Sequence, residues 1–398
     1  MLNRLHQFQS KKWIRTVADS CFYLGLLIEL AIVLLDKSFF VNPIEGRLFQ
    51  ITFCLFFLKM LLTEFDFKEY IIIFVMCLLG LFVDRLADRN EILRMTVFVF
   101  SIKNVDFKKA MKFTLWITTI GCAVIMLLSV TGIYGSLKVA KEYQGVGDVY
   151  RFAFGMGNAN AFHCMFFVLL LLALYLYYEK INWWVYVVLF VLNVCIYLLT
   201  DSRTGMLITA LSILLFAHMK LLVRKKRTRI LKWLSLASVL SYIGMIGLSV
   251  YFAYDTWKIF YKRWSLPGAP EKSIIYILDR ALTGRISTLS ATEGWKGAMV
   301  SWTWLPDKAH TDYFDLGYVR LFYWYGIIAA VLILGIFLLL EIYLCTKKNY
   351  AELLFLTMIS IYTLMEAHFV SVYIGRCYPL FILGAFGFEL FKKDWLKD

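Results

Sequence analysis

Charged residues are scarce in this sequence. They make up 18% of its 398 residues, whereas 61% are hydrophobic and the mean hydropathy is +0.70. A soluble domain carries about 25% charged and roughly 45–50% apolar residues, and a water-soluble sphere of this size has too little interior to hide so many apolar side chains. The composition therefore excludes an ordinary cytosolic enzyme, a disulfide-stapled secreted domain and a disordered chain, and it predicts a polytopic membrane protein.

The sequence also lacks the cysteine patterns of metal sites and disulfide frameworks. It contains no Cys-x-x-Cys pair and no Cys/His cluster. Nearly all of its 8 cysteines lie within apolar runs, where cysteine behaves as a small hydrophobic residue. We therefore expect no resident metal or cofactor and no disulfides. A basic, polar start is followed by an apolar run without a small-residue cleavage site, which predicts a retained first span.

Twelve apolar stretches are candidates for membrane spans. A span needs about 20 apolar residues, because each helical residue adds about 1.5 Å toward a hydrocarbon core of roughly 30 Å. Backbone groups in lipid must be satisfied within the segment, so we expect helices and an all-α fold. The stretches near 70–83 and 92–103 are short, and tilted, re-entrant or buried helices remain alternatives there. The candidates lie near 17–35, 48–63, 70–83, 92–103, 112–133, 156–178, 182–200, 204–223, 231–252, 317–344, 351–371 and 373–391.

Lys and Arg in the loops predict the orientation. With twelve spans and a cytoplasmic N-terminus, the basic clusters at 11–15, 103–112, 224–229, 347–348 and 392–393 all fall on the cytoplasmic side, as does the C-terminus. The net charge of +14 then anchors loops rather than binding nucleic acid, because no basic face with interleaved aromatic residues occurs outside the spans.

Two loops on the predicted outer side are long. They cover about 134–155 and 253–316, and we expect short helices in the second, for example around 271–298. A long non-spanning stretch in a compact protein is usually functional. The whole chain is otherwise expected to be a single transmembrane domain. It shows no internal repeat, which disfavours transporter folds built from repeated halves.

Arginines on the outer side are not explained by anchoring. Arg203 lies in a tight turn between two apolar spans, where an ionic group is costly and functional by default; the alternatives are snorkelling to the headgroups or pairing with Asp201. Arg151 precedes a Gly/Asn-rich stretch that includes Asn160, which either lets a ligand approach the backbone or starts a helix. Arg285 lies in the long loop, where a solvated surface charge is the alternative.

Candidate bases occur close to the tenth span. The stretch from His310 to Tyr318 offers an imidazole and carboxylates, or simply caps a membrane helix. Glu366, His368 and Arg376 flank the last outer turn, where they either contact a substrate or form a local ion pair and cap. The forked donors of guanidinium groups suit phosphate oxygens, and a nearby carboxylate or imidazole suits proton abstraction from a hydroxyl. Together these residues indicate chemistry on a lipid-linked phosphate or pyrophosphate.

At these residues the sequence resembles the Wzy polysaccharide polymerases of the O-antigen ligase/polymerase superfamily. The stretch from Asp201 to Gly205 is similar to a Ser-Arg-Thr-Gly turn of that family, and Leu282 to Arg285 is similar to its Gly-Arg element. Arg151 with Gly155 and Asn160 resembles the family's Arg…Gly-Phe-x-x-Pro-Asn stretch, with Ala159 in place of the proline. The stretch from Asp315 to Tyr318, with Gly326 after it, resembles the family's Asp-Asn-x-Tyr element and its following glycine.

The resemblance implies a GT-C-type glycosyltransferase that joins oligosaccharide repeat units carried on undecaprenyl pyrophosphate. It implies Arg203 and Arg285 as pyrophosphate ligands, with Arg151 as a third. Asp315 is the implied base, and His310 is a rival because the ligase branch carries histidine at this position. Residues implied to shape the substrate site are Asn160, Asp201, Gly284 and Tyr318, and Arg376 at the last outer turn is predicted to contact the acceptor sugar.

The expected partners are membrane lipid, a separate flippase and a chain-length regulator, with no nucleic acid. Two other functions remain open. A ligase would move finished glycan from the lipid carrier to a different acceptor. A flippase or transporter would need polar residues through the middle of several spans, where Glu29 and Lys59 are the main exceptions to clean apolar sequence.

Overall fold

The computed structural model describes residues 2–143, 147–265, 277–279, 282, 284–292, 298–366, 369 and 371–391. Nearly all regular structure in these ranges is helical, which confirms the expected all-α class. The helices are α1 (Leu2–Gln9), α2 (Lys12–Lys37), α3 (Glu45–Leu61), α4 (Phe67–Ala87), α5 (Glu91–Ser101), α6 (Phe107–Val130), α7 (Ala159–Tyr177), α8 (Trp183–Thr200), α9 (Arg203–Arg224), α10 (Thr228–Ser265), α13 (Gly317–Thr346), α14 (Tyr350–Thr363) and α15 (Pro379–Phe386). Three short 3₁₀ helices are η1 (Ser287–Ala291), η2 (Ile374–Arg376) and η3 (Gly387–Phe391).

Eight helices in the described part of the chain are long and apolar enough to cross a membrane: α2, α4, α6, α7, α8, α9, α10 and α13. Each of the twelve predicted stretches contains a helix, but α3 and α5 have only 17 and 11 residues. Helix α14 and the segment Pro379–Leu390 are apolar but also short. The structure thus supports a membrane-embedded, polytopic protein, while the count of twelve spans stays a prediction.

The chain forms two compact units, each built from segments that are far apart in the sequence. The first comprises Met1–Phe65, Val97–Leu231 and Tyr373–Arg376. The second comprises Asp66–Thr96, Lys232–Val372 and Cys377–Asp398.

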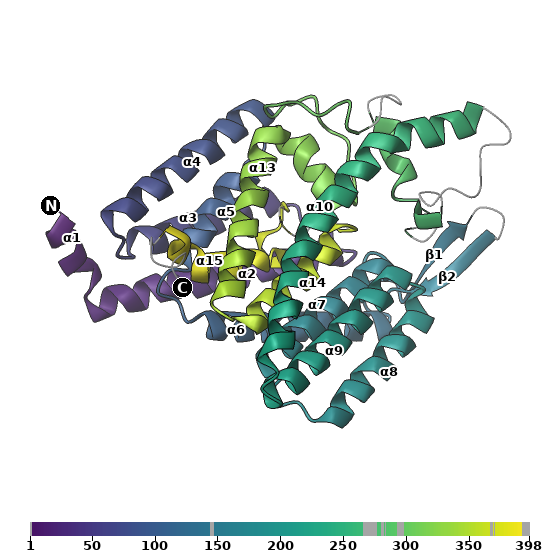
Figure 1. The fold of residues 1–398 in the computed structure, drawn as a ribbon, viewed down its shortest axis with the longest axis horizontal. Coiled ribbons are helices and arrows are strands. Elements are labelled where there is room, and N and C mark those ends of the chain that lie inside the picture. The colour runs from purple at the N-terminus through teal and green to yellow at the C-terminus, as the bar shows by residue number, and fades with distance from the viewer. Residues whose placement is uncertain are drawn as a thin grey trace. The chain divides into compact units, whose positions relative to one another are not determined.

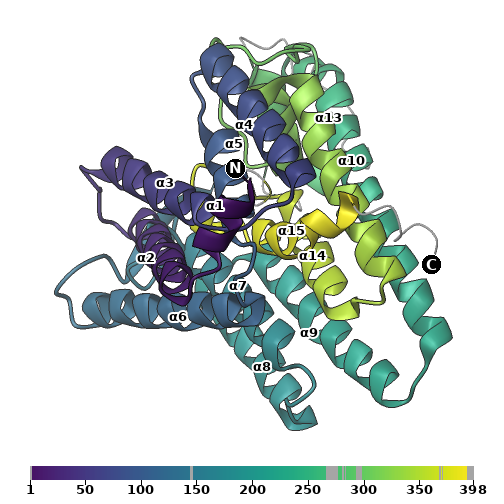
Figure 2. The same ribbon diagram turned by 90° about the vertical axis from the view of Figure 1, so that its left-hand side faces the viewer.

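In the first unit, α2 lies between α3 and α6 (Figure 2). The buried rings of Phe22, Phe56 and Phe98 pack against one another in this unit, with centroids 5.0–6.2 Å apart. Helices α7, α8 and α9 run side by side (Figure 1), and α6 packs on α7. This helical layer supports the residues around the predicted Ser-Arg-Thr-Gly turn.

A β-hairpin occupies most of the predicted loop 134–155. Strand β1 (Lys138–Tyr143) pairs antiparallel with β2 (Gly147–Phe152), with Val139 opposite Arg151. Strand β2 contacts α8 at the end of the α7–α9 layer (Figure 1). The hairpin therefore gives Arg151 a fixed backbone position that a flexible loop would not provide.

In the second unit, α10 and α13 lie next to each other (Figures 1 and 2). The hydroxyl of Tyr242 on α10 donates to the carbonyl oxygen of Leu334 on α13 at 2.9 Å. Helix α10 continues to Ser265 and so includes the start of the predicted loop 253–316. Most of the helix expected around 271–298 lies outside the described residues, as do Lys392 and Lys393 of the predicted C-terminal basic cluster; within the described part of that range, η1 is present.

Helix α13 is kinked at Gly326. This residue has φ of 75° and ψ of 165°, a conformation that strains any residue with a side chain. A Cβ atom there would lie 2.7 Å from the carbonyl carbon of Leu305 and 2.9 Å from the nitrogen of Pro306. The kink thus lets the segment before α13 pass directly against the helix.

We expect Gly326→Ala to lower the free energy of unfolding by about 1–3 kcal/mol, because alanine is strained at this φ and its Cβ meets backbone that cannot move cheaply. Gly335→Ala is the matched control, since it lies on the same helix and a Cβ there has nothing within 4 Å. Thermal unfolding in detergent distinguishes the two variants. Equal melting temperatures would contradict the role assigned to Gly326.

Candidate functional site

Arg285 joins two carboxylates in the second unit. Its Nε donates to Oδ2 of Asp315 at 3.1 Å, and its Nη2 donates to Oε1 of Glu366 at 3.2 Å. The three residues are separated by 30 and 81 positions in the sequence. The structure thus brings together the predicted base, one predicted cation and one of the charges at the last outer turn.

The exposure of the three side chains is uneven. The Arg285 side chain is 11% exposed, that of Glu366 25% and that of Asp315 44%. Burial of the guanidinium lowers its pKa, but the charges of Glu366 and Asp315 outweigh this effect and hold the pKa of Arg285 above its ordinary value. Neither Nη1 of Arg285 nor Oδ1 of Asp315 makes a hydrogen bond with any described residue. The cluster therefore has an oriented Asp315 carboxylate with Oδ1 available as an acceptor, and Nη1 of Arg285 available as a donor.

A compact turn holds Arg285 in place. Asp279 is buried, and its Oδ1 accepts hydrogen bonds from the backbone N–H groups of Ile286 at 2.8 Å and Ser287 at 2.9 Å. Gly284 has a φ of +83°, and its N–H donates to the Asp279 carbonyl oxygen at 2.9 Å. Gly284 is thus needed for the turn itself. Sequence reasoning missed Asp279, because it lies five residues before Gly284 and forms no recognisable turn motif with it.

The two rival bases have different surroundings. His310 is buried, its ring stacks on Tyr323 at 4.3 Å, and its Nδ1 lies 2.6 Å from the Tyr323 carbonyl oxygen. That carbonyl can only accept a hydrogen bond, so Nδ1 carries the proton. Asp315 is partly exposed and fixed by a cation. The geometry therefore favours Asp315 over His310 as a group that meets a substrate.

Tyr318 lies in the core of the second unit. It is 1% exposed, and its hydroxyl bonds to Oγ of Ser360 at 2.7 Å and to the carbonyl oxygen of the same residue at 3.0 Å. These bonds tie the first turn of α13 to α14. Tyr318 can therefore shape the site by holding the helix that follows Asp315.

Arg151 is surrounded by fixed partners in the first unit. It is 4% exposed, its Nε donates to the carbonyl oxygen of Thr200, and its Nη2 donates to Oδ1 of Asn160 at 2.9 Å. The guanidinium thus links β2 to the start of α7 and the end of α8. This arrangement satisfies a helix-end carbonyl that has no partner within α8.

A buried histidine extends this arrangement. Nδ1 of His163 lies 3.0 Å from Oγ1 of Thr200, and its Nε2 lies 3.2 Å from Oδ1 of Asn193. Gly205 allows this packing, because a Cβ there would lie 2.7 Å from the His163 ring. The glycine of the Ser-Arg-Thr-Gly stretch therefore has a packing role. Sequence reasoning did not single out His163 or Asn193, which look like ordinary interruptions of apolar spans.

Arg203 differs from Arg151. Asp201 ends α8 in a left-handed conformation with φ of 46°, and Arg203 is the first residue of α9. Arg203 is exposed and makes no hydrogen bond or ion pair with any residue of the described ranges, so the alternative pairing with Asp201 is not observed. Its guanidinium stands at a helix N-terminus, which also favours anions.

Arg376 and His368 complete the predicted set. Arg376 belongs to η2 in the first unit, is 9% exposed, and lies 5.7 Å from the ring centroid of Tyr373. His368 lies outside the described residues. Among the described residues, no group of three or more His, Cys, Asp or Glu side chains is placed to hold a metal ion.

Sequence reasoning also missed a cluster of arginines and aromatic rings in the second unit. The guanidinium carbons of Arg89 and Arg320 lie 3.8 and 4.7 Å from the ring centroid of Trp324. Nη2 of Arg89 also donates to the carbonyl oxygen of His310 at 3.2 Å. Arg320 and Trp324 are four residues apart on α13, a spacing that predicts contact on a helix. This cluster supports the segment that leads to Asp315.

No family model, curated protein or solved structure matches this chain. Its function must therefore be inferred from the arrangement of its own side chains.

Proposed function

We propose that this protein is a membrane glycosyltransferase that polymerises oligosaccharide repeat units carried on undecaprenyl pyrophosphate, at the outer leaflet of the cell membrane. The observation that carries the proposal is the Glu366–Arg285–Asp315 cluster. The two residues that the family resemblance implies as cation and base are hydrogen-bonded to each other, and the carboxylate is partly exposed.

The cluster suits the removal of a proton from an acceptor hydroxyl. Arg285 fixes Oδ2 of Asp315 at 3.1 Å, which leaves Oδ1 to accept the proton of a sugar hydroxyl. The acceptor oxygen then forms a bond to the anomeric carbon of the donor glycan. The bond from that carbon to the pyrophosphate oxygen breaks, and its electron pair leaves with undecaprenyl pyrophosphate. A base in this position contributes about 10²–10⁴-fold in rate.

The leaving pyrophosphate needs cations rather than a protonating acid. Its negative charge develops as the bond breaks, and fixed donors aimed at that charge are a major source of catalysis. The proposal assigns this role to the unbonded Nη1 of Arg285 and, on the family resemblance alone, to Arg203, which has no partner among the described residues. Each charge-assisted hydrogen bond contributes about 1.5–3 kcal/mol.

We therefore expect Arg203→Ala to lower the polymerisation rate by about 10–100-fold, which corresponds to about 1.4–2.8 kcal/mol. The melting temperature should not change, because the side chain is exposed and bonds to no described residue. Arg229→Ala, an exposed arginine in the predicted cytoplasmic cluster, is the control and should retain full activity. Full activity in both Arg203→Ala and Arg285→Ala would overturn the assignment of these arginines.

The class of product tests the proposed function. Purified protein in liposomes should convert lipid-linked repeat units into a ladder of chains that differ by one unit. Transfer of a preformed chain to a different acceptor, without a ladder, would instead identify a ligase. Movement of the lipid-linked substrate across the bilayer with no new glycosidic bond would identify a transporter and refute the proposal.

A further inference from the structure

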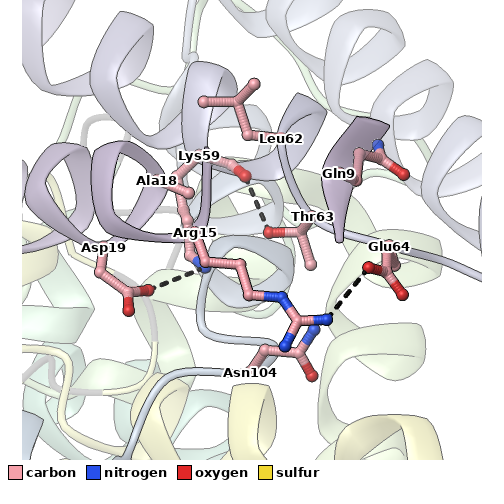
Figure 3. Close-up of a pocket in the computed structure, with 9 residues that line it drawn as sticks. All are labelled: Gln9, Arg15, Ala18, Asp19, Lys59, Leu62, Thr63, Glu64 and Asn104. Atoms are coloured by element: carbon pink, nitrogen blue, oxygen red, sulfur yellow. Dashed lines mark hydrogen bonds and ion pairs between the residues drawn. The ribbon is translucent and has the colours of Figure 1, made fainter. Parts of the chain in front are cut away.

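A cavity of about 400 Å³ lies in the first unit, and none of the residues assigned to glycosyl transfer lines it (Figure 3). It is lined by residues from the ends of α1, α2 and α3, from the segment after α3, and by Asn104 in the turn between α5 and α6. Its volume is within the range of small-ligand sites, roughly 300–1,000 Å³. The lining residues are Gln9, Arg15, Ala18, Asp19, Lys59, Leu62, Thr63, Glu64 and Asn104.

The cavity contains two cations and two carboxylates in separate pairs. Nζ of Lys59 lies 3.3 Å from Oδ1 of Asp19, and Nη2 of Arg15 lies 3.3 Å from Oε1 of Glu64 (Figure 3). The Lys59 side chain is 4% exposed, whereas the Asp19 side chain is 49% exposed. A buried ammonium with one half-exposed partner is costly and marks a functional position in a membrane protein.

Gln9 supplies an acceptor that lacks a donor. It is 2% exposed, and its Nε2 donates to the carbonyl oxygen of Leu61 at 2.8 Å. Its Oε1 is buried and receives no hydrogen bond from any described residue. Buried polar atoms are nearly always hydrogen-bonded, so a ligand with an N–H or O–H donor would satisfy this oxygen.

The cavity lies where helices enter and leave the apolar region. Helix α2 begins at Lys12, α3 ends at Leu61 and α6 begins at Phe107, and both α2 and α6 are long and apolar enough to cross a membrane. Lys and Arg close to the ends of membrane spans are typical of the level of the lipid headgroups. This position therefore favours a ligand from the bilayer surface.

We propose that this cavity binds the headgroup of a zwitterionic phospholipid of the phosphatidylethanolamine type. Lys59 and Arg15 bind the phosphate, while Gln9 Oε1, Asp19 and Glu64 accept from the ammonium. Equal numbers of cations and carboxylates match a zwitterion. Phosphatidylglycerol would place an anion beside the two carboxylates without an ammonium to pair with them, and phosphatidylcholine has no N–H to donate to Gln9.

Native mass spectrometry of the full chain tests this proposal. Protein stripped of lipid in detergent is mixed with equal amounts of phosphatidylethanolamine, phosphatidylcholine and phosphatidylglycerol, and the bound lipids are counted. We expect about tenfold higher retention of phosphatidylethanolamine than of the other two, a difference of about 1.4 kcal/mol. Lys59→Gln should lose about tenfold in this retention, and Lys109→Gln, a control on α6 with a 76% exposed side chain, should lose nothing.

Two further variants separate the predicted contacts. Gln9→Leu should abolish the preference for phosphatidylethanolamine over phosphatidylcholine while the phosphate contacts remain. Asp19→Asn removes one negative charge from the cavity and should raise the retention of phosphatidylglycerol. Because the Asp19 side chain is half-exposed, we expect this variant to fold normally. Equal retention of the three lipids by the unmodified protein, or equal losses in Lys59→Gln and Lys109→Gln, would overturn the proposal. Lipid counting needs no glycan substrate, so its outcome is independent of the proposed enzyme activity.

Discussion

Replacement of Asp315 by asparagine is expected to lower the polymerisation rate by about 10²–10⁴-fold, the usual contribution of a general base. Asparagine has nearly the same shape and can still accept from Nε of Arg285, which lies 3.1 Å from the carboxylate. It cannot take a proton from an acceptor hydroxyl. The loss should therefore appear in kcat, measured from initial rates of repeat-unit addition, with little change in KM or in melting temperature.

His310→Gln is the matched variant for the rival base. Glutamine can still donate to the Tyr323 carbonyl oxygen, to which Nδ1 of His310 lies close at 2.6 Å. We expect this variant to be less stable, because the stacked ring is lost, but to retain a rate within about tenfold of the unmodified protein. An active Asp315→Asn together with an inactive His310→Gln would transfer the role of base to the histidine.

Replacement of Arg151 by methionine is expected to cost roughly 3–5 kcal/mol in the free energy of unfolding. The guanidinium is buried, and its loss leaves the Thr200 carbonyl oxygen and Oδ1 of Asn160 without the donors they now have. Charge-assisted hydrogen bonds contribute about 1.5–3 kcal/mol each, and an acceptor left unpaired in a buried site adds to the loss. Thermal unfolding in detergent measures the effect.

Arg203→Met is the control for this second prediction. It removes the same side chain from an exposed position without described partners, so its melting temperature should equal that of the unmodified protein. The pair separates a structural arginine from a substrate-binding one. Unchanged stability but lost activity in Arg151→Met would instead support the third pyrophosphate contact that the family resemblance implies.

Hydropathy predicted where most helices lie, but not where they end. Hydropathy predicts an apolar span over about 70–83, whereas α4 extends over Phe67–Ala87. The first turn of the helix contains polar residues, so it lies outside the apolar stretch. Asp66 and Glu69 form a capping box there, in which each side chain accepts from the other residue's backbone N–H. Such residues lower the local hydropathy while they stabilise the helix, so a search for apolar runs stops short of the true end.

Pairings between distant residues could not be predicted from one sequence. Arg285 and Glu366 are 81 positions apart, and no local pattern indicates their ion pair. The sequence indicated the types of residue at the site because arginine near a membrane surface is costly and therefore informative. It could not separate the enclosed Arg151 from the exposed Arg203, since the difference depends on which backbone carbonyl each guanidinium reaches.

Only some of the charged residues within the apolar helices were identified from the sequence. Glu29 and Lys59 stood out in the sequence, and the structure gives each a partner: Glu29 Oε1 accepts from the Thr52 hydroxyl at 2.6 Å, and Lys59 pairs with Asp19. Glu341 on α13 is 0% exposed, and neither of its carboxyl oxygens bonds to a described residue. A single acidic residue in a long apolar helix is easily overlooked, because it hardly changes the mean hydropathy of the segment.

The stoichiometry of lipid release tests the central claim most directly. Glycosyl transfer from a pyrophosphate donor must free one undecaprenyl pyrophosphate for each glycosidic bond formed. Purified protein with a defined lipid-linked repeat unit should therefore release the lipid pyrophosphate in a one-to-one ratio with new linkages, and Asp315→Asn should reduce both products together. New linkages without lipid release, or no linkage at all from folded protein, would contradict the account.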